Sequence, residues 1–359
     1  MCLPWVCNII NVKISSSSIF EMNKTVLITG AAGFIGFHLS ARLMREGFIV
    51  TGLDNLNDYY DPELKKLRLK VLSDLSFTLG ADFTFHKFDL ADKDRVADFF
   101  RDNYFDVVIN LAAQAGVRYS IDNPMVYADA NLTGFLNILE GCRYSRPQHL
   151  IFASSSSVYG MNDKVPFAVS DNTDYPISLY AATKKSNELM AHAYSHLYKI
   201  PITGLRFFTV YGPFGRPDMA YFKFTKAIVE GRAIEVFNNG KMQRDFTYID
   251  DIVEGIFKLI PKIPKEQSSK ASNAIARFKV YNIGNNAPVE LDRFISAIEK
   301  ATGKIAKKIN LPMQPGDVPV TFADIDDLML DVGFRPDTNI DDGIKKFVEW
   351  YMPYARKSR

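Results

Sequence analysis

The segment TVLITGAAGFIGFHL, residues 25–39, constrains the fold of this chain more than any other stretch. A β-rich apolar run leads directly into Gly30, Gly33 and Gly36, and an amphipathic stretch of helical length follows. Glycines in this G-x-x-G-x-x-G turn let the backbone approach a pyrophosphate, whose charge is met by free N–H groups at the helix N-terminus. The segment therefore predicts a strand–turn–helix unit that binds a dinucleotide.

The kind of dinucleotide is indicated by the next strand candidate, FIVTGLD (48–54). It ends at Asp54, whose carboxylate is placed to accept hydrogen bonds from an adenosine ribose and to repel a 2′-phosphate, so NAD is favoured over NADP. A glycine fingerprint alone is a weak signal, but here the strand, the helix and the acid are all in place. The residues of this unit and of the following strand ends that we expect to bind NAD are Gly30, Gly33, Phe34, Ile35, Gly36, Asp54, Asp89, Leu90, Ala112 and Ala113.

Short β-rich runs alternate with helical ones along the first 208 residues. Several of these runs are nearly all apolar, as expected when helices cover both faces of a parallel sheet. The alternation predicts an α/β fold, a doubly wound parallel (Rossmann) sheet over residues 23–208. The further strand candidates are 83–90, 106–112, 149–155 and 202–208.

The regular alternation ends at about residue 208, where proline- and glycine-rich pieces begin. We expect a smaller, split second domain over 209–359, with residues 280–286 returning a strand to the first sheet. Residues 1–22 are apolar but carry no positive charge ahead of the apolar part, so they make a poor signal peptide. We interpret them as a disordered or artefactual extension; a short targeting or anchoring segment is the alternative.

Composition excludes several classes of protein. The 359 residues are 47% hydrophobic with a net charge of +2, which gives no reason to expect a nucleic acid or a membrane as partner. Cys2, Cys7 and Cys142 are too few for a disulfide framework or a zinc cluster in a chain this long, and the histidines lack metal-ligand spacing. We therefore expect a cytoplasmic protein without a bound metal.

The segment SLYAATKKS places Tyr180 and Lys184 four residues apart, hence on one face of a helix. Free tyrosine has a pKa of about 10 and is a poor base at neutral pH, but a lysine one turn along favours the phenolate and lowers that pKa. In isolation this spacing occurs by chance in many helices. After a glycine fingerprint and a strand that ends in serines, IFASSSS (151–157), it indicates an active site.

These three elements together resemble the extended short-chain dehydrogenase/reductase family, over essentially the whole chain from Met22. The resemblance implies tightly bound NAD and a catalytic triad. In that triad Ser155 orients the substrate O4, Tyr180 is the general base, and Lys184 tunes the base. Tyr180 and Lys184 would also contact the NAD.

The residues after the triad serine narrow the reaction. Family members that dehydrate nucleotide sugars carry an Asp-Glu pair there, because elimination of water needs an extra acid and base. Here those places hold Ser156 and Ser157, which disfavours dehydration and decarboxylation and leaves epimerisation at C4.

Three further segments, LRFFTVYGPFGRPDMAYFKF, NLAAQAGVRYS and MQPGDVP, look like the UDP-glucuronate 4-epimerases. That resemblance implies a UDP-sugar substrate (UDP-glucuronate or UDP-galacturonate), with Arg244 on the diphosphate and Asp317 on the uridine ribose. Arg118 is ambiguous, and Ser156, Ser157 and Arg216 have alternatives in which they only satisfy backbone or lie at the surface. The donors implied for the uronate carboxylate are Ser155, Ser156, Ser157, Thr209 and Arg216.

Three other functions stay open. One is a 4-epimerase acting on UDP-glucose and UDP-galactose or on N-acetylhexosamines, against which Thr209 speaks, because UDP-glucose epimerases usually have asparagine there. The others are a dehydrogenase that releases NADH and a non-catalytic NAD-binding regulatory protein. The resemblance also implies a homodimer, packed through the helix that bears Tyr180 and a helix at about 124–145.

Overall fold

The computed structural model describes residues 23–269, 272–313 and 320–357. Residues 1–22 and Asp317, on which two of the sequence expectations fall, lie outside them. The chain divides into two compact units. The first comprises the described residues up to Gly160, Thr173–Arg206 and Ile256–Tyr281, and the second Met161–Asn172, Phe207–Gly255 and the chain from Asn282 onward.

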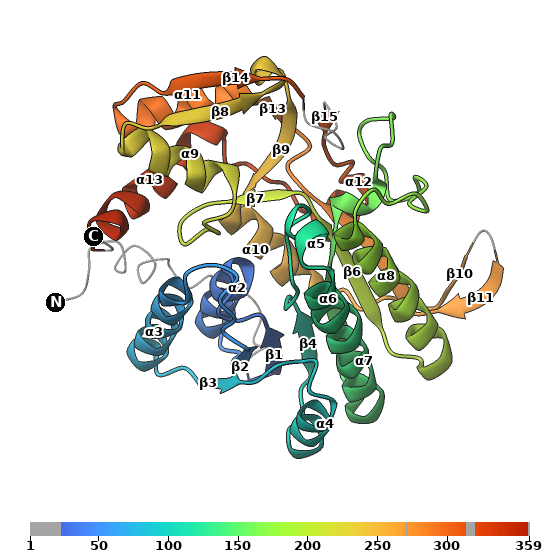
Figure 1. Ribbon diagram of the computed structural model, residues 1–359. Helices are drawn as coiled ribbons and strands as arrows, with labels where there is room; N and C mark the ends of the chain where they lie inside the picture. Colours follow the sequence, from blue (N-terminus) through green and yellow to red (C-terminus); the bar gives the residue numbers. More distant parts are fainter. Residues whose placement is uncertain (1–22, 270–271, 314–319, 358–359) are drawn as a thin grey trace. The chain divides into compact units, whose positions relative to one another are not determined.

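The first unit is built on a seven-stranded sheet, and the α/β doubly wound prediction is confirmed. The strand order is β12-β6-β5-β4-β1-β2-β3, and β1 pairs in parallel with both β2 and β4. Figure 1 labels β6, β4, β1, β2 and β3 of this sheet. The order thus reverses at β1, which in doubly wound folds marks the ligand crevice at the carboxyl ends of the strands. The strands are β1 (Thr25–Thr29), β2 (Ile49–Asp54), β3 (Phe83–Lys87), β4 (Val107–Asn110), β5 (His149–Ser155), β6 (Ile202–Phe207) and β12 (Phe278–Ile283).

Helices connect and cover these strands. In the first unit α4 packs on α7, α7 packs on α8, and α2 packs on α3. A buried apolar cluster lies between the sheet and helices α4, α7 and α8, and the strands contribute apolar side chains such as Val108, Leu150 and Phe152 to it. The helices are α2 (Phe34–Arg45), α3 (Pro62–Leu79), α4 (Lys93–Asp102), α5 (Tyr119–Asp122), α6 (Pro124–Tyr127), the π-helix η1 (Ala128–Thr133), α7 (Gly134–Ser145), the 3₁₀ turn η2 (Ser156–Tyr159) and α8 (Leu179–Tyr198).

The second unit combines small sheets with three longer helices. Strand β9 pairs with β13, β15 and β7, while β8 and β14 form a separate parallel pair. Aromatic side chains of α9 and α13, among them Phe222, Phe347 and Trp350, pack against one another, with the Phe222 and Trp350 rings edge to face and the other two pairs tilted. The elements are β7 (Thr209–Tyr211), α9 (Ala220–Val229), β8 (Ala233–Phe237), η3 (Asn238–Gly240), β9 (Gln243–Tyr248), β13 (Pro288–Glu290), α11 (Leu291–Thr302), β14 (Lys307–Leu311), β15 (Val320–Thr321), α12 (Asp326–Val332) and α13 (Ile340–Lys357).

Besides the expected return of a strand near residues 280–286, the two units depart from the expected boundary at residue 208 in further places. Helix α10 (Ile249–Leu259) begins in the second unit and ends in the first, and the hairpin β10 (Gln267–Ser269) and β11 (Ser272–Ala276) follows in the first. Strand β12 is an edge strand of the large sheet, beside β6. In the other direction, Phe167 forms a bridge with Ala323, so the segment around it belongs to the second unit.

A membrane-spanning segment is not found in the described part of the chain. None of its helices combines the length and the apolar character needed to cross a bilayer.

Candidate active site

The glycine turn after β1 brings two strand ends unusually close together. Gly30 has a left-handed backbone conformation with φ of +70°, and a Cβ atom there would lie 2.8 Å from the backbone nitrogen of Ala112, just after β4. A Cβ at Gly36 would lie 2.2 Å from the carbonyl oxygen of Gly30. Because only glycine avoids these overlaps, the turn leaves backbone exposed at the reversal of strand order.

Helix α2 starts directly from this turn. Gly33 is its N-cap, and among the described residues no side chain caps the helix there. The first-turn N–H groups, those of Phe34 and Ile35 included, are therefore available to a ligand, and the helix dipole favours a negative one. This arrangement fits the pyrophosphate of NAD.

Asp54 is the last residue of β2 and is buried. Its carboxylate accepts hydrogen bonds from the backbone nitrogens of Ala32 (3.2 Å) and Leu56 (2.8 Å), so it is fixed against the glycine turn. Sequence patterns did not single out the next residue, Asn55, whose amide donates to Asp89 Oδ2 at 2.7 Å. These bonds bring the ends of β2 and β3 together, where we expect the adenosine ribose.

The end of β4 is held by a buried polar pair. Thr29 Oγ1 donates to Asn110 Oδ1 (2.6 Å) and accepts from the backbone nitrogen of Ala112 (3.1 Å), which precedes Ala113. Leu90, after β3, is buried, and its carbonyl accepts from the amide of Asn137 at 2.8 Å. The predicted NAD residues thus share one edge of the sheet, and the donor set and the cradle fit this cofactor.

Ser155, the serine predicted to belong to the triad, lies at the carboxyl end of β5. Ser155 is buried, and its Oγ accepts a hydrogen bond from the backbone nitrogen of Ser157 at 3.2 Å, which starts η2. Ser155 Oγ and Ser157 Oγ are also 3.2 Å apart. Ser156 and Ser157 are half-buried. The serines therefore form a tight turn of hydroxyl groups rather than an extension of the strand.

Tyr180 and Lys184 lie one turn apart near the start of α8. Lys184 is buried and its Nζ donates to the carbonyl oxygen of Ala153 on β5 at 2.9 Å, two residues before Ser155. Burial lowers the pKa of Lys184 to about 8. The helix face with the phenol and the amine is thus attached to the strand that carries the serine, as a Ser-Tyr-Lys triad requires.

Tyr127, which sequence patterns did not single out, links the loop after β4 to the phenol. Its hydroxyl donates to the carbonyl oxygens of Ala115 and Gly116, and its ring lies edge-on to that of Tyr180 with centroids 6.1 Å apart. Arg118 follows in the same loop and is exposed at the start of α5.

The remaining predicted substrate residues belong to the second unit. Thr209 starts β7 and lies opposite Phe246 of β9, while Arg244 of β9 lies opposite Thr321 of β15. Arg244 is half-buried and donates to the carbonyl of Gln243. Thr209 and Arg244 are therefore on adjacent strands.

Arg216 is held in an ion pair. Its guanidinium contacts both carboxylate oxygens of Asp218, at 3.0 Å and 2.5 Å. Two contacts anchor the loop around it. The buried ring of Phe214 has its centroid 5.0 Å from that of Trp350, and the backbone nitrogen of Arg216 donates a hydrogen bond to the Tyr221 hydroxyl. Asp218 is a residue that the sequence reasoning missed.

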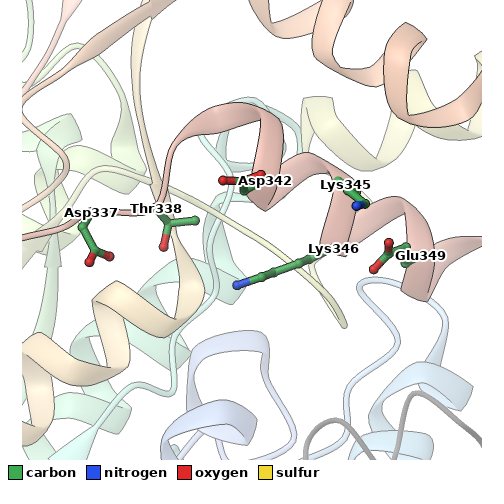
Figure 2. Close-up of a pocket in the computed structure, with 6 residues that line it drawn as sticks. All are labelled: Asp337, Thr338, Asp342, Lys345, Lys346 and Glu349. Atoms are coloured by element: carbon green, nitrogen blue, oxygen red, sulfur yellow. The ribbon is translucent and has the colours of Figure 1, made fainter.

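The second unit also has a polar pocket beside α13, shown in Figure 2. Its charged groups are mixed in sign, and no predicted site residue lines it. In the described residues no group of acids, histidines and cysteines is suited to hold a metal ion. The lining residues are Asp337, Thr338, Asp342, Lys345, Lys346 and Glu349.

A doubly wound sheet with a glycine turn, an acid at the end of β2 and a Ser-Tyr-Lys constellation defines a nicotinamide-dinucleotide enzyme of the short-chain dehydrogenase/reductase type. Residues 26–284 match the NAD dependent epimerase/dehydratase family. The chain belongs to this family, and the prediction of NAD as cofactor is confirmed at that level.

Similar proteins are found in bacteria. The chain is 56% identical to Protein CapI of Staphylococcus aureus, over 92% of this chain and 99% of that one. It is 50% identical to a probable UDP-glucuronate 4-epimerase of Rhizobium meliloti, over 92% and 98%. A crystal structure of a UDP-glucuronic acid 4-epimerase from Bacillus cereus, in complex with UDP-glucuronic acid and NAD, superimposes with a TM-score of 0.80 at 33% identity, covering 92% and 99%.

Proposed function

We propose that this protein is a UDP-glucuronate 4-epimerase, which interconverts UDP-glucuronate and UDP-galacturonate with tightly bound NAD. The observation that carries the proposal is the triad of Ser155, Tyr180 and Lys184 followed by the neutral Ser156 and Ser157 instead of an acid pair. The relative from Rhizobium meliloti, which is 50% identical and is named a probable UDP-glucuronate 4-epimerase, supports the same conclusion.

The residues of the chain have distinct roles in this reaction. Tyr180 takes the proton from the sugar O4, Ser155 holds that oxygen, and Lys184 stabilises the phenolate while it forms. NAD, when bound, accepts the C4 hydride and later returns it. The keto sugar turns about its diphosphate linkage in between, so that Tyr180 returns the proton after the opposite face has been reduced.

The uronate carboxylate requires donors, and buried charge-assisted hydrogen bonds are worth about 1.5–3 kcal/mol each. We assign this task to the serine turn with Thr209 and Arg216, and the diphosphate and the uridine ribose to Arg244 and Asp317. A direct contact of Arg118 with the substrate is the remaining part of the proposal. A β-keto acid tends to lose CO2, so donors that fix the carboxylate would also slow that loss.

The test is to incubate the purified protein with UDP-glucuronate and no added NAD. We expect UDP-galacturonate to form, because the cofactor is not consumed and remains bound. UDP-glucose, which lacks the carboxylate, serves as the matched substrate. Conversion of UDP-glucose without conversion of UDP-glucuronate would contradict the carboxylate assignment.

Tyr180→Phe distinguishes an enzyme from an NAD-binding regulator. Phenylalanine keeps the ring beside Tyr127 but removes the proton acceptor. We expect nearly all epimerase activity to be lost while NAD remains bound. Unchanged activity would reject Tyr180 as the base.

We propose further that the protein is a homodimer in a reducing cytosol. Helices α7 and α8 pack on each other and expose large apolar side chains, with Tyr144 74%, Leu189 59% and Leu197 64% exposed. A second copy would cover them. Light scattering should give a molar mass of twice that of one chain. The double variant Leu189→Glu, Leu197→Glu should have the mass of a single chain. A wild-type protein that is monomeric would contradict the proposal.

A further inference from the structure

Four buried polar side chains form a hydrogen-bonded network next to the serine turn, residues 155–157. Ser154 Oγ donates to Glu188 Oε1 at 2.6 Å, and Arg206 pairs with the same carboxylate through two hydrogen bonds of 2.8 Å. Arg206 also donates to the hydroxyl of Tyr159 at 3.0 Å. All four residues are buried in the first unit, and they come from β5, η2, α8 and β6.

Stability alone is a poor reason for this ion pair. Taking two charges out of water costs several kcal/mol per ion, and apolar replacements of similar volume are often as stable or more so. Burial lowers the pKa of Arg206, but the hydrogen bonds and the charge of Glu188 outweigh it and raise that pKa, so the guanidinium stays charged. What a bidentate pair supplies instead is fixed geometry.

These contacts fix the residues on both sides of Ser155. On α8, Lys184 contacts Ala153 and Glu188, one turn later, contacts Ser154, so two successive residues of β5 are held by one helix face. Arg206 holds Tyr159 on the other side of the turn, where the guanidinium also lies 4.9 Å from the ring centroid.

We propose that Glu188, together with Arg206, is a positioning residue for the reaction: it fixes Ser154 and Tyr159 so that the hydroxyl of Ser155, between them, faces the reacting oxygen and the phenol of Tyr180. Neither Glu188 nor Ser154 is a reacting group. The inference rests on the proposed epimerase function. The wild-type protein is measured in the same assay, so an inactive wild type would reject the epimerase function, whereas an active wild type with unaffected variants would reject only the role of Glu188.

The test uses Ser154→Ala, which deletes one buried hydroxyl, and Glu188→Gln, which keeps the shape but removes the charge. The rate of UDP-glucuronate conversion is divided by the bound NAD, so that only folded, loaded protein counts. We expect kcat to fall about tenfold in both variants with KM within about twofold of wild type, because binding groups are untouched. Ser154→Thr, which restores a hydroxyl, should recover kcat.

Thr203→Val is the matched control. It deletes a buried hydroxyl that bonds to His149 at 2.8 Å, at the opposite end of the same pair of strands. We expect it to lower the thermal midpoint as much as Ser154→Ala but to leave kcat within about twofold of wild type. If Ser154→Ala fails to fold, Glu188→Gln alone decides. Losses of kcat under threefold, or losses no larger than that of the control, would overturn the proposal.

Discussion

Gly30 and Gly80 share a left-handed backbone conformation but differ in their surroundings. A Cβ at Gly30 meets the backbone of Ala112, whereas a Cβ at Gly80, after α3, meets nothing within 4 Å. Gly80→Ala therefore measures the conformational cost alone, about 1–2 kcal/mol, whereas Gly30→Ala adds a steric overlap in the NAD turn.

We expect Gly30→Ala to be purified without NAD and Gly80→Ala to retain it. The measurement is the amount of NAD released per chain on denaturation, with chemical unfolding as a check that both variants fold. Equal NAD content in the two variants would contradict a role for the glycine turn in cofactor binding.

At the residue scale, the features that could be predicted are those set by local spacing. Tyr180 and Lys184 follow from a helical period, and Asp54 from its place at a strand end. Glu188 could not be predicted, because its partners Ser154 and Arg206 are 34 and 18 residues away. The pairing of Arg216 with Asp218 is close in sequence, but the pattern of the loop does not indicate it.

At the scale of the element, helix α8 depends on its N-cap. Ser178 Oγ accepts a hydrogen bond from the backbone nitrogen of Ala181 at 3.1 Å, and Tyr180 lies in the same first turn. Helix α3 is capped in the same way by Asp61, which accepts from Glu63 at 2.9 Å.

Each cap is worth about 1 kcal/mol, so Ser178→Ala and Asp61→Ala should lower the free energy of unfolding by similar amounts. Only Ser178→Ala should also lower kcat, since fraying at that end moves the phenol. Denaturant unfolding and initial rates check both statements. An equal loss of kcat in the α3 variant would argue against this explanation.

The element types in the first unit were predicted well because buried parallel strands and amphipathic helices differ in period. Boundaries were less accurate: the expected strand at 83–90 ends at Lys87, because the chain turns at Asp89, whose carboxylate accepts a hydrogen bond from the backbone nitrogen of Ala91. The short strands of the second unit could not be predicted, because their pairing joins distant segments, such as β9 with β15.

At the scale of the whole molecule, stability at acid pH is expected to depend on His149. This side chain is fully buried between the carbonyl oxygen of Ile260 and the Thr203 hydroxyl, and burial lowers its pKa from 6.5 to about 4. Between these values the unfolded chain binds a proton that the folded chain does not. The contribution to stability is therefore complete above pH 6.5 and is lost as the pH falls toward 4.

We expect protonation of His149 in the unfolded chain to lower the free energy of unfolding by about 2 kcal/mol between pH 7 and pH 5. His149→Gln, which cannot be protonated, should remove that part of the pH dependence even if it is less stable overall. Chemical unfolding of both proteins at the two pH values gives the difference. An equal change in the free energy of unfolding between the two pH values in both proteins would show that His149 does not cause this pH dependence.

The sequence by itself determined the dinucleotide turn, the alternation of strands and helices, and the spacing of the phenol and the amine. These are local properties, set by backbone geometry and by the period of each element. Only the tertiary structure decided that residues 161–172 belong to the second unit, that β12 lies beside β6 in the large sheet, and that Glu188 and Arg206 pair next to the serine turn. Such pairings depend on the packing of segments far apart in the chain, because the cost of burying a polar group is offset only by the partner that the fold brings to it.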